Sequence, residues 1–207
     1  MADNNTTINP DNVTTGSPVE GACAFVSFDP DVTIPTDATT DLTAASSGFE
    51  NLGELSEQGY TLSNSSEVSK FKGWHGKTLL SEVSGEEDTL KLELVEVMRP
   101  TANKLRYGAD AITESNGFVS AIAPDGLPKQ IVCVVIDELF ANGTKQRTVA
   151  ARAKAESVDD EAHQKGSLLV YGMTFSLLAD EAGKPYHKYR AVPAADDDDD
   201  DDDDGNG

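Results

Sequence analysis

Hydrophobic and polar residues alternate along much of the chain, most cleanly in residues 88–97, "DTLKLELVEV". Leu90, Leu92 and Leu94 share one phase of this pattern, whereas Glu93 lies in the other. Because successive side chains of a strand point to opposite sides, the pattern predicts a β-strand with one buried face.

Three later segments extend the β pattern. Residues 129–140, "KQIVCVVIDELF", are almost continuously apolar and rich in β-branched side chains, which predicts a strand buried on both faces. Residues 145–155 and 167–179 alternate again. In 145–155, the alternation predicts one face with Val149, Ala151, Ala153 and Ala155, and an opposite face with Arg152 and Lys154.

The rest of the chain after residue 66 adds shorter elements. Strands are expected at 21–28, 68–74, 77–85, 117–122 and 186–190, with turns at 75–76, 141–144 and 180–185. Residues 99–108 favour a helix, since Pro100 suits its first turn and Gly108 its C-terminal cap. The sequence therefore predicts an all-β fold with one short helix, arranged as a β-sandwich or barrel.

The segment of residues 29–66 interrupts the alternation. It is rich in Asp, Glu, Ser, Thr and Gly, and it contains no Lys, Arg or His. We expect a long loop here, and a loop of this length within a compact domain usually has a function. Gly53 and Gly59 bracket "ELSEQ", but the Gly-Lys-Ser/Thr ending of a phosphate-binding loop is missing.

Composition and charge set the domain limits and the class of partner. We expect a flexible N-terminal arm (1–20), one β domain (21–192) and an acidic, disordered tail (193–207). The formal charge is −21, and removing the nine aspartates of 196–204 leaves −12. An acidic body repels nucleic acid backbones, which excludes an ordinary DNA- or RNA-binding module but suits a surface that DNA passes without adhering. We expect no membrane-spanning helix and no secretory signal.

Groups able to do chemistry are scattered. The three histidines (His75, His163 and His187) lack partners at metal-ligand spacing, and the serines of the long loop (Ser56, Ser63 and Ser65) lack the setting of a nucleophile elbow. Glu54 and Glu57 have no neighbour that would orient them as an acid–base pair. We therefore expect no catalytic, cofactor or metal site, and so no enzyme.

Two further pairs of residues have packing explanations. Cys23 and Cys133 lie in separate apolar runs, as expected of reduced thiols packed as small hydrophobic groups, and a disulfide is the alternative. Phe71 and Trp74, at the end of a predicted strand, are expected in core or interface packing.

Four motifs in order resemble the major tail tube protein of long, non-contractile (siphovirus-type) bacteriophage tails. They are "PTDATTDL" (35–42), "FENLGELSEQGY" (49–60), "KFKGWHGKTL" (70–79) and "DTLKLELVE" (88–96). The likeness covers about residues 21–190 and excludes the arm and the aspartate run. It implies two β-sheets packed roughly orthogonally with a flanking helix. It also implies rings, usually hexamers, that stack into a hollow tube for DNA.

The resemblance also implies partners and a location. We expect a homo-oligomer in the virion, made in the host cytoplasm, that meets the tape measure protein and the tail terminator and tip proteins and inserts into no membrane. Candidates for contacts between rings, all in the long loop, are Phe49, Leu52, Gly53, Glu57 and Gly59. Candidates for carboxylates facing the lumen are Glu82, Glu93 and Glu138.

A monomeric ligand- or carbohydrate-binding β-sandwich is the alternative, because the strand pattern alone does not separate the two. Such a module would carry aromatic residues on an exposed face. Aromatic residues make up only 6% of this chain, and most fall at positions typical of a core.

Overall fold

The structure is a computed structural model of the chain and describes residues 13–19 and 22–191. The predicted N-terminal arm lies largely, and the aspartate run wholly, outside these residues. The strands are β1 (Gly16–Pro18), β2 (Ala24–Ser27), β3 (Glu50–Gly53), β4 (Leu55–Lys72), β5 (Thr78–Leu94), β6 (Ile112–Ser115), β7 (Phe118–Ile122), β8 (Ile131–Phe140), β9 (Lys145–Val158), β10 (Tyr171–Leu177) and β11 (His187–Ala191). In the described part, α1 (Pro100–Tyr107) is the one α-helix, so the predicted all-β fold with one short helix is confirmed.

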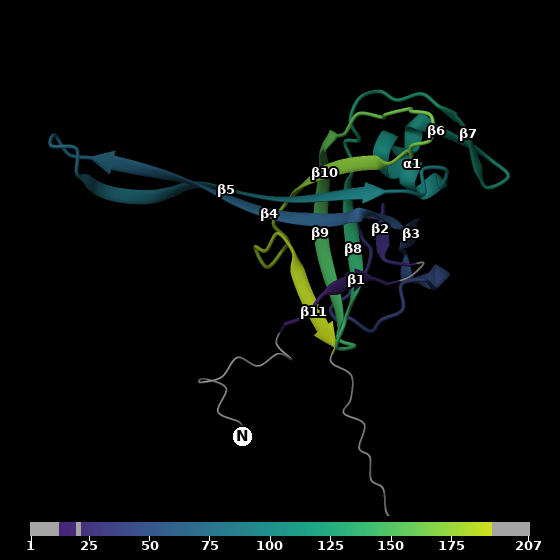
Figure 1. The fold of residues 1–207 in the computed structure, drawn as a ribbon, viewed down its shortest axis with the longest axis horizontal. Helices are drawn as coiled ribbons and strands as arrows, with labels where there is room; N and C mark the ends of the chain where they lie inside the picture. Colours follow the sequence, from purple (N-terminus) through teal and green to yellow (C-terminus); the bar gives the residue numbers. More distant parts are fainter. Residues whose placement is uncertain (1–12, 20–21, 192–207) are drawn as a thin grey trace, which may run out of the picture.

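Nine strands form one sheet that folds over itself. Its order is β3-β2-β8-β9-β10-β5-β4, with β1 added beside β8 and β11 beside β9. The long strand β9 turns the corner, since its first part pairs with β8 and β11 and its last part pairs with β10. The β10-β5-β4 layer consequently lies across the β8-β9 layer, and the predicted pair of crossed sheets is two layers of one sheet (Figure 1).

The main core fills the space between the two layers. Leucines 90, 92 and 94 of β5 face Val134 and Ile136 of β8, and α1 closes the side with Ala102 and Leu105. The helix begins at Pro100, where no N–H is needed, and ends before Gly108, whose φ of 93° suits glycine. The buried face that the alternation in residues 88–97 predicts is therefore confirmed.

A second, smaller core lies on the outer face of β2, β8 and β9. Phe25, Cys133, Val135 and Val149 form its floor, and Leu42 and Phe49 of the irregular residues 28–49 cover it. These residues 28–49 are called the covering segment below. Residues 132–136 of β8 are buried on both faces, as predicted, because cores lie on either side of them.

The face predicted for β9 is wrong in one respect. Val149 belongs to the smaller core on the outer face of the sheet (the outer core), whereas Ala153 belongs to the main core between the two layers (the inner core). Val132 pairs with Ala153 but Val134 pairs with Ala150, so β9 contains an extra residue there. Such a β-bulge reverses the phase of the alternation, which a strict period of two does not anticipate.

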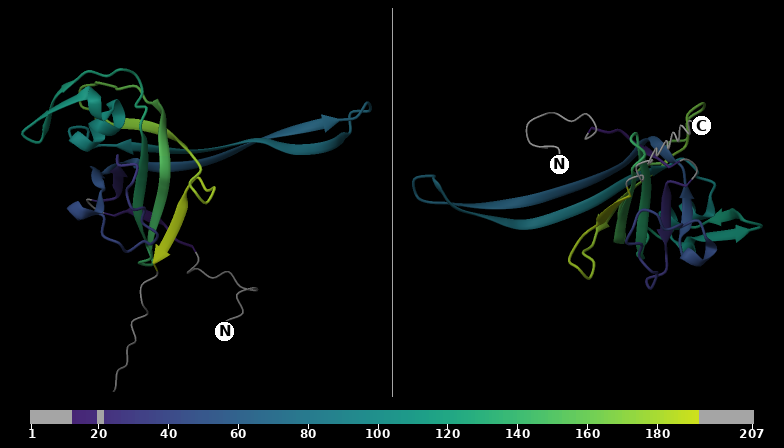
Figure 2. Two further views of the ribbon diagram at one scale, coloured as in Figure 1. Left: turned by 180° about the vertical axis from the view of Figure 1, so that it is seen from behind. Right: turned by 90° about the horizontal axis from the view of Figure 1, so that it is seen from below.

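The largest departure concerns residues 50–94. The prediction of a loop up to residue 66 is wrong for Glu50–Gly53 and Leu55–Ser66, which are β3 and the first part of β4. The strands predicted at 77–85 and 88–97 are one strand, β5. Together β4 and β5 form a hairpin that extends far from the body (Figures 1 and 2).

Two smaller elements also differ from expectation. Gly16–Pro18, which the sequence placed in the arm, pairs with Glu138–Phe140 of β8. β6 was missed. It pairs with β7 through an Asn116-Gly117 turn in which both residues have positive φ, the signature of a tight hairpin.

Candidate functional site

The outer half of the β4–β5 hairpin exposes large apolar side chains. The last pairing of β5 with the body joins Thr89 to Ser176 of β10, and beyond it the two strands pair only with each other. Within that region Val68, Phe71, Leu79, Leu80 and Val83 are all about half exposed or more, and Trp74 at the turn is 99% exposed. The structure thus excludes a core position for Phe71 and Trp74.

These side chains occupy both faces of the hairpin. Val68 lies opposite Val83, whereas Phe71 lies opposite Leu80, three residues further along each strand. An odd spacing in a strand reverses the face, so the two pairs point in opposite directions. An isolated two-stranded hairpin is marginally stable in water, and exposed apolar patches of this kind mark interaction surfaces.

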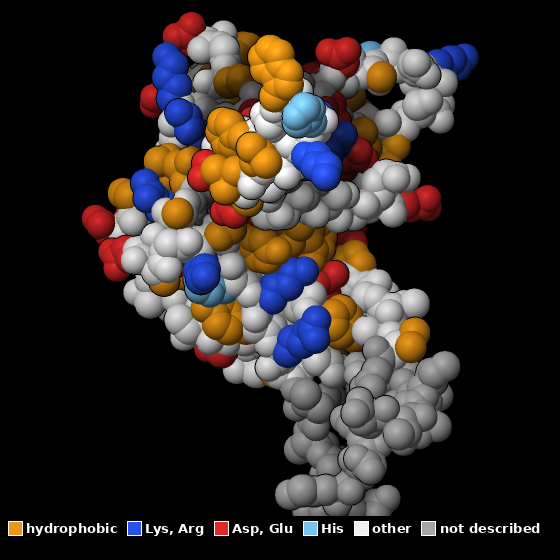
Figure 3. All heavy atoms as spheres, turned by 90° about the vertical axis from the view of Figure 1, so that its left-hand side faces the viewer, with side chains coloured by type: hydrophobic (Ala, Val, Ile, Leu, Met, Phe, Trp, Pro, Cys, Tyr) orange, Lys and Arg blue, Asp and Glu red, His pale blue; other side chains and the backbone are white. Residues whose placement is uncertain are grey.

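Charge is divided along the hairpin. Residues 70–80, called the hairpin tip below, contain Lys70, Lys72 and Lys77 and no carboxylate. Residues 81–88 contain four carboxylates and no Lys or Arg. Figure 3 looks onto the end of the hairpin, where hydrophobic side chains gather beside basic ones. The tip is therefore an apolar, basic surface on an otherwise acidic protein.

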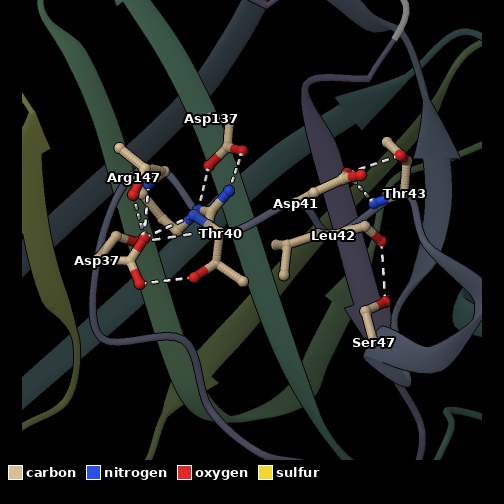
Figure 4. Close-up of polar contacts among 9 residues, drawn as sticks. Asp37, Thr40, Asp41, Leu42, Thr43, Ser47, Asp137 and Arg147 are labelled. Atoms are coloured by element: carbon tan, nitrogen blue, oxygen red, sulfur yellow. Dashed lines mark hydrogen bonds and ion pairs between the residues drawn. The ribbon is translucent and has the colours of Figure 1, made fainter.

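The carboxylates and hydroxyls of the covering segment bind their own backbone. Asp37 Oδ1 accepts hydrogen bonds from the N–H groups of Thr39 and Thr40, both at 2.6 Å, and Asp37 Oδ2 accepts one from Thr40 Oγ1 (Figure 4). Asp41 accepts from the N–H and Oγ1 of Thr43 in the same way. These bonds, led by that from the Thr40 hydroxyl, hold the pKa of Asp37 well below its usual range.

An ion pair beneath the covering segment ties it to β8 and β9. Arg147 of β9 donates two hydrogen bonds to Asp137 of β8, from Nε at 2.7 Å and from Nη2 at 2.6 Å. Its Nη1 donates to the carbonyl of Asp37 at 3.3 Å (Figure 4). The Arg147 side chain is only 3% exposed, so the pair is part of the fold.

The predicted contact residues of the long loop separate into two groups. Phe49 and Leu52 are buried in the outer and inner cores, and Gly53, with φ of 91°, packs so closely on Glu96 that a Cβ would collide with its side chain. Glu57 is exposed and Gly59, with φ of 62°, sits where the register of β4 shifts. Only this second group lies at the surface.

The three predicted lumen carboxylates also differ from one another. Glu93 accepts a hydrogen bond from Ser56 Oγ at 3.0 Å, and Glu138 accepts from Tyr60 Oη at 2.7 Å and Gln146 Nε2 at 2.8 Å. Glu82 is exposed, on the hairpin opposite Ser69. Glu82 is therefore the one of the three with a carboxylate clear of the body.

The groups considered for catalysis serve structural roles or lie apart. His187 bonds to Asp180 at 2.6 Å, which joins β11 to the turn before it. Across residues 13–19 and 22–191, no three His, Cys, Asp or Glu side chains are placed to hold a metal, and no helix is long and apolar enough to cross a bilayer. Cys23 and Cys133 are unpaired, and burial raises the pKa of the Cys133 thiol to about 12.

A groove that the sequence did not indicate lies at the edge of the outer core. It has a volume of about 570 Å³ and lies between the start of the covering segment, the first part of β8 and the turn that precedes β11. Its walls include Val32, Ile34 and Ile131, and its acidic groups are Asp29, Asp180 and Glu181. The segments that form it are far apart in sequence, so only folding brings them together.

Comparison with known proteins gives one clear result. A search of curated proteins gave no match. The family model described as phage tail tube protein matches residues 12–191, which include every strand and the helix described above. The chain therefore belongs to the phage tail tube protein family.

Proposed function

We propose that this protein polymerises as stacked rings of six subunits into the hollow tube of a long, non-contractile phage tail, through which DNA passes into the host. Membership of the tail tube family supports the structural role in the virion. The observation that carries the assembly is the β4–β5 hairpin, which exposes on both faces apolar side chains that no other described element of its own subunit covers.

The hairpin is the arm that joins subunits, in place of the loop expected from the sequence. It projects roughly 30 Å from Ser63 to Lys72 at about 3.3 Å per residue, enough to cross much of a neighbour. Strands β3 and β4 end the order of the large sheet, so each offers an edge to another subunit. Glu57 and Gly59, at the root of the hairpin, lie where a second ring would meet this one.

The acidity of the protein suits a channel for DNA. Carboxylates on the wall of a bore repel phosphates, so the DNA slides without adhering. We propose that Glu82 is a carboxylate that faces the lumen. Glu93 and Glu138 would contribute less to the repulsion of DNA, because neighbouring side chains donate hydrogen bonds to their oxygens. The tape measure protein would occupy the lumen before DNA, and terminator and tip proteins would close the ends. The subunit would be made in the host cytoplasm and would insert into no membrane.

Electron microscopy of the purified full-length chain tests this proposal. Rings or tubes with a central hole are expected, with six subunits in an averaged top view. A protein that stays monomeric at all concentrations would contradict the proposal. It would favour a ligand- or carbohydrate-binding module, for which the groove of about 570 Å³ would be the site.

A further inference from the structure

We propose that the groove between the covering segment, β8 and the turn before β11 receives the hairpin tip of a second copy of this chain. Trp74 would lie between the apolar walls, and the tip lysines would face the acidic groups. The inference rests on the proposed function, because it requires subunits that assemble.

The apolar surfaces of the tip and the groove match. The tip exposes Trp74 almost fully, together with Phe71, Leu79 and Leu80. A tryptophan buries on the order of 200 Å² when it is covered, so this residue alone gives a strong reason to bind. The groove has a size typical of sites that enclose a large side chain, and Ile34 and Ile131 in its walls are themselves about 40% exposed.

The charges of the tip and the groove are complementary. The tip carries three lysines and no carboxylate. The groove carries Asp29, Asp180 and Glu181, and its cation Arg152 donates a hydrogen bond to the carbonyl of Ala179. Asp180 is already bonded to His187, so Asp29 and Glu181 are the carboxylates that the tip lysines would meet. Opposite charges around an apolar centre favour one docked orientation and exclude others.

Within the described part of the subunit, no element outside the hairpin covers the tip. Figures 1 and 2 show the hairpin directed away from the body in each view. Its pairing beyond Thr89 involves β4 and β5 alone. A second copy is the one molecule certain to be present in a homopolymer, and its groove is the cover that we propose for the tip.

A second hollow is the competing receptor. It lies at the root of the hairpin, has a volume of about 420 Å³ and includes Glu54, Glu57 and Glu138. It carries no Lys or Arg, so its charge also suits the tip. Its apolar walls are fewer, with Leu55 and Ile136 both largely buried, which makes it the poorer site for an indole.

Chemical crosslinking separates the two receptors. We would make three full-length chains that keep Trp74: His75→Cys with Ala182→Cys in the groove, His75→Cys with Glu57→Cys in the second hollow, and His75→Cys with Leu127→Cys as a control. Positions 57, 127 and 182 are exposed, and the native Cys23 and Cys133 are buried, so a short bis-maleimide reports on the new pairs. The assembled protein is then run on a denaturing gel.

A ladder of linked subunits is expected only for the 75–182 pair. Tubes that form while 75–182 gives no ladder, or while 75–57 gives one, would overturn the inference and leave the proposed function intact. A wild-type chain that never assembles would instead overturn the proposed function, and the inference with it.

A charge exchange provides the second test. Lys70→Glu with Lys72→Glu, or Asp29→Lys with Glu181→Lys, should each raise the protein concentration needed for assembly by about tenfold or more. The chain carrying all four substitutions should assemble almost as readily as wild type. If the combined chain is worse than either parent, the tip and this groove do not meet. Circular dichroism of each variant checks that the exposed substitutions leave the fold unchanged.

Discussion

The covering segment has buried side chains on an irregular backbone, whereas the outer half of the β4–β5 hairpin has exposed side chains on paired strands. The covering segment contains no strand, yet Leu42 and Phe49 are buried and Asp37 and Asp41 bond its backbone. The hairpin is paired strand along almost its whole length, yet its outer half has no buried side chain. Backbone pairing and core formation are thus separate in this protein, and each region has one without the other.

This difference indicates where folding and assembly reside. A segment anchored by side chains over a core contributes to the stability of the subunit. A hairpin stabilised only by its own pairing gains stability when a partner covers it. We therefore expect substitutions in the covering segment to unfold the subunit and substitutions in the hairpin tip to prevent polymerisation.

The largest effect is expected from deleting residues 35–62. The sequence alone predicts that this deletion leaves a soluble chain unable to polymerise. The structure predicts instead that the chain does not fold, because Leu42, Leu52 and Leu55 leave both cores. Loss of the β signal in circular dichroism checks this, and a folded monomer would show that the covering segment is dispensable.

Shortening the hairpin should have the opposite outcome. Ser66 lies opposite Glu86, so residues 67–85 can be replaced by Asn-Gly, which closes a two-residue turn. The subunit should unfold at about the same denaturant concentration as wild type, because nothing in the cores is removed. Tubes should be absent in micrographs, and tubes of normal length would contradict the role given to the hairpin.

Removing the cation beneath the covering segment should destabilise the subunit strongly. Arg147→Ala leaves Asp137 without its partner in a largely buried site, and we expect a loss of about 3–5 kcal/mol in the free energy of unfolding. Chemical denaturation measures it. Arg152→Ala is the matched control, since Arg152 is exposed and should cost less than about 1 kcal/mol.

Two phenylalanines permit the same substitution in both regions. Phe49→Ala empties part of the outer core and should cost about 3 kcal/mol. Phe71 lies in strand β4 but is 53% exposed. Phe71→Ala should therefore change the free energy of unfolding of the monomer by about 0.5 kcal/mol or less. Equal costs by chemical denaturation would show that the outer hairpin is packed within the subunit.

The smallest effect concerns the pH dependence of the covering segment. The folded state holds the pKa of Asp37 below its usual range, so its contribution to stability is present above about pH 4, the unfolded value, and is lost as the pH falls through the folded pKa. The difference in denaturation midpoint between wild type and Asp37→Ala should therefore shrink on acidification. A difference that grows at low pH would contradict this assignment.

The elements of the core were predictable because their patterns are local. The helix between Pro100 and Gly108, the doubly buried β8 and the buried face of β5 follow from residue order and period. The lower part of β4 was missed since "SEQGYTLSNSS" has few apolar residues, and its strand form depends on pairing with β5. The bulge in β9 was missed because it arises from the register with β8.

The features of the candidate site also separate into those that the sequence indicates and those that depend on the fold. The motif order indicated the family and the net charge an acidic protein, whereas the basic tip became evident only once the hairpin was known. The sequence predicted that Phe49 and Leu52 contact a neighbouring ring, but both are buried within the subunit. An apolar residue in a sequence does not indicate whether its own core or a neighbouring subunit covers it. The groove was not predictable, because Ile34, Ile131 and Glu181 meet only in three dimensions.

The sequence by itself determined the strand-rich class, the single helix, the acidic charge and the family, since each depends on residue identity and local spacing. Tertiary structure decided which apolar residues are buried, because burial is set by the elements that pack against a side chain. It placed Phe49 of the covering segment against the outer face of the sheet and left Trp74 exposed at the end of the hairpin. Both are aromatic residues beside glycines in the sequence, and only the folded sheet, which covers one and ends before the other, separates their roles.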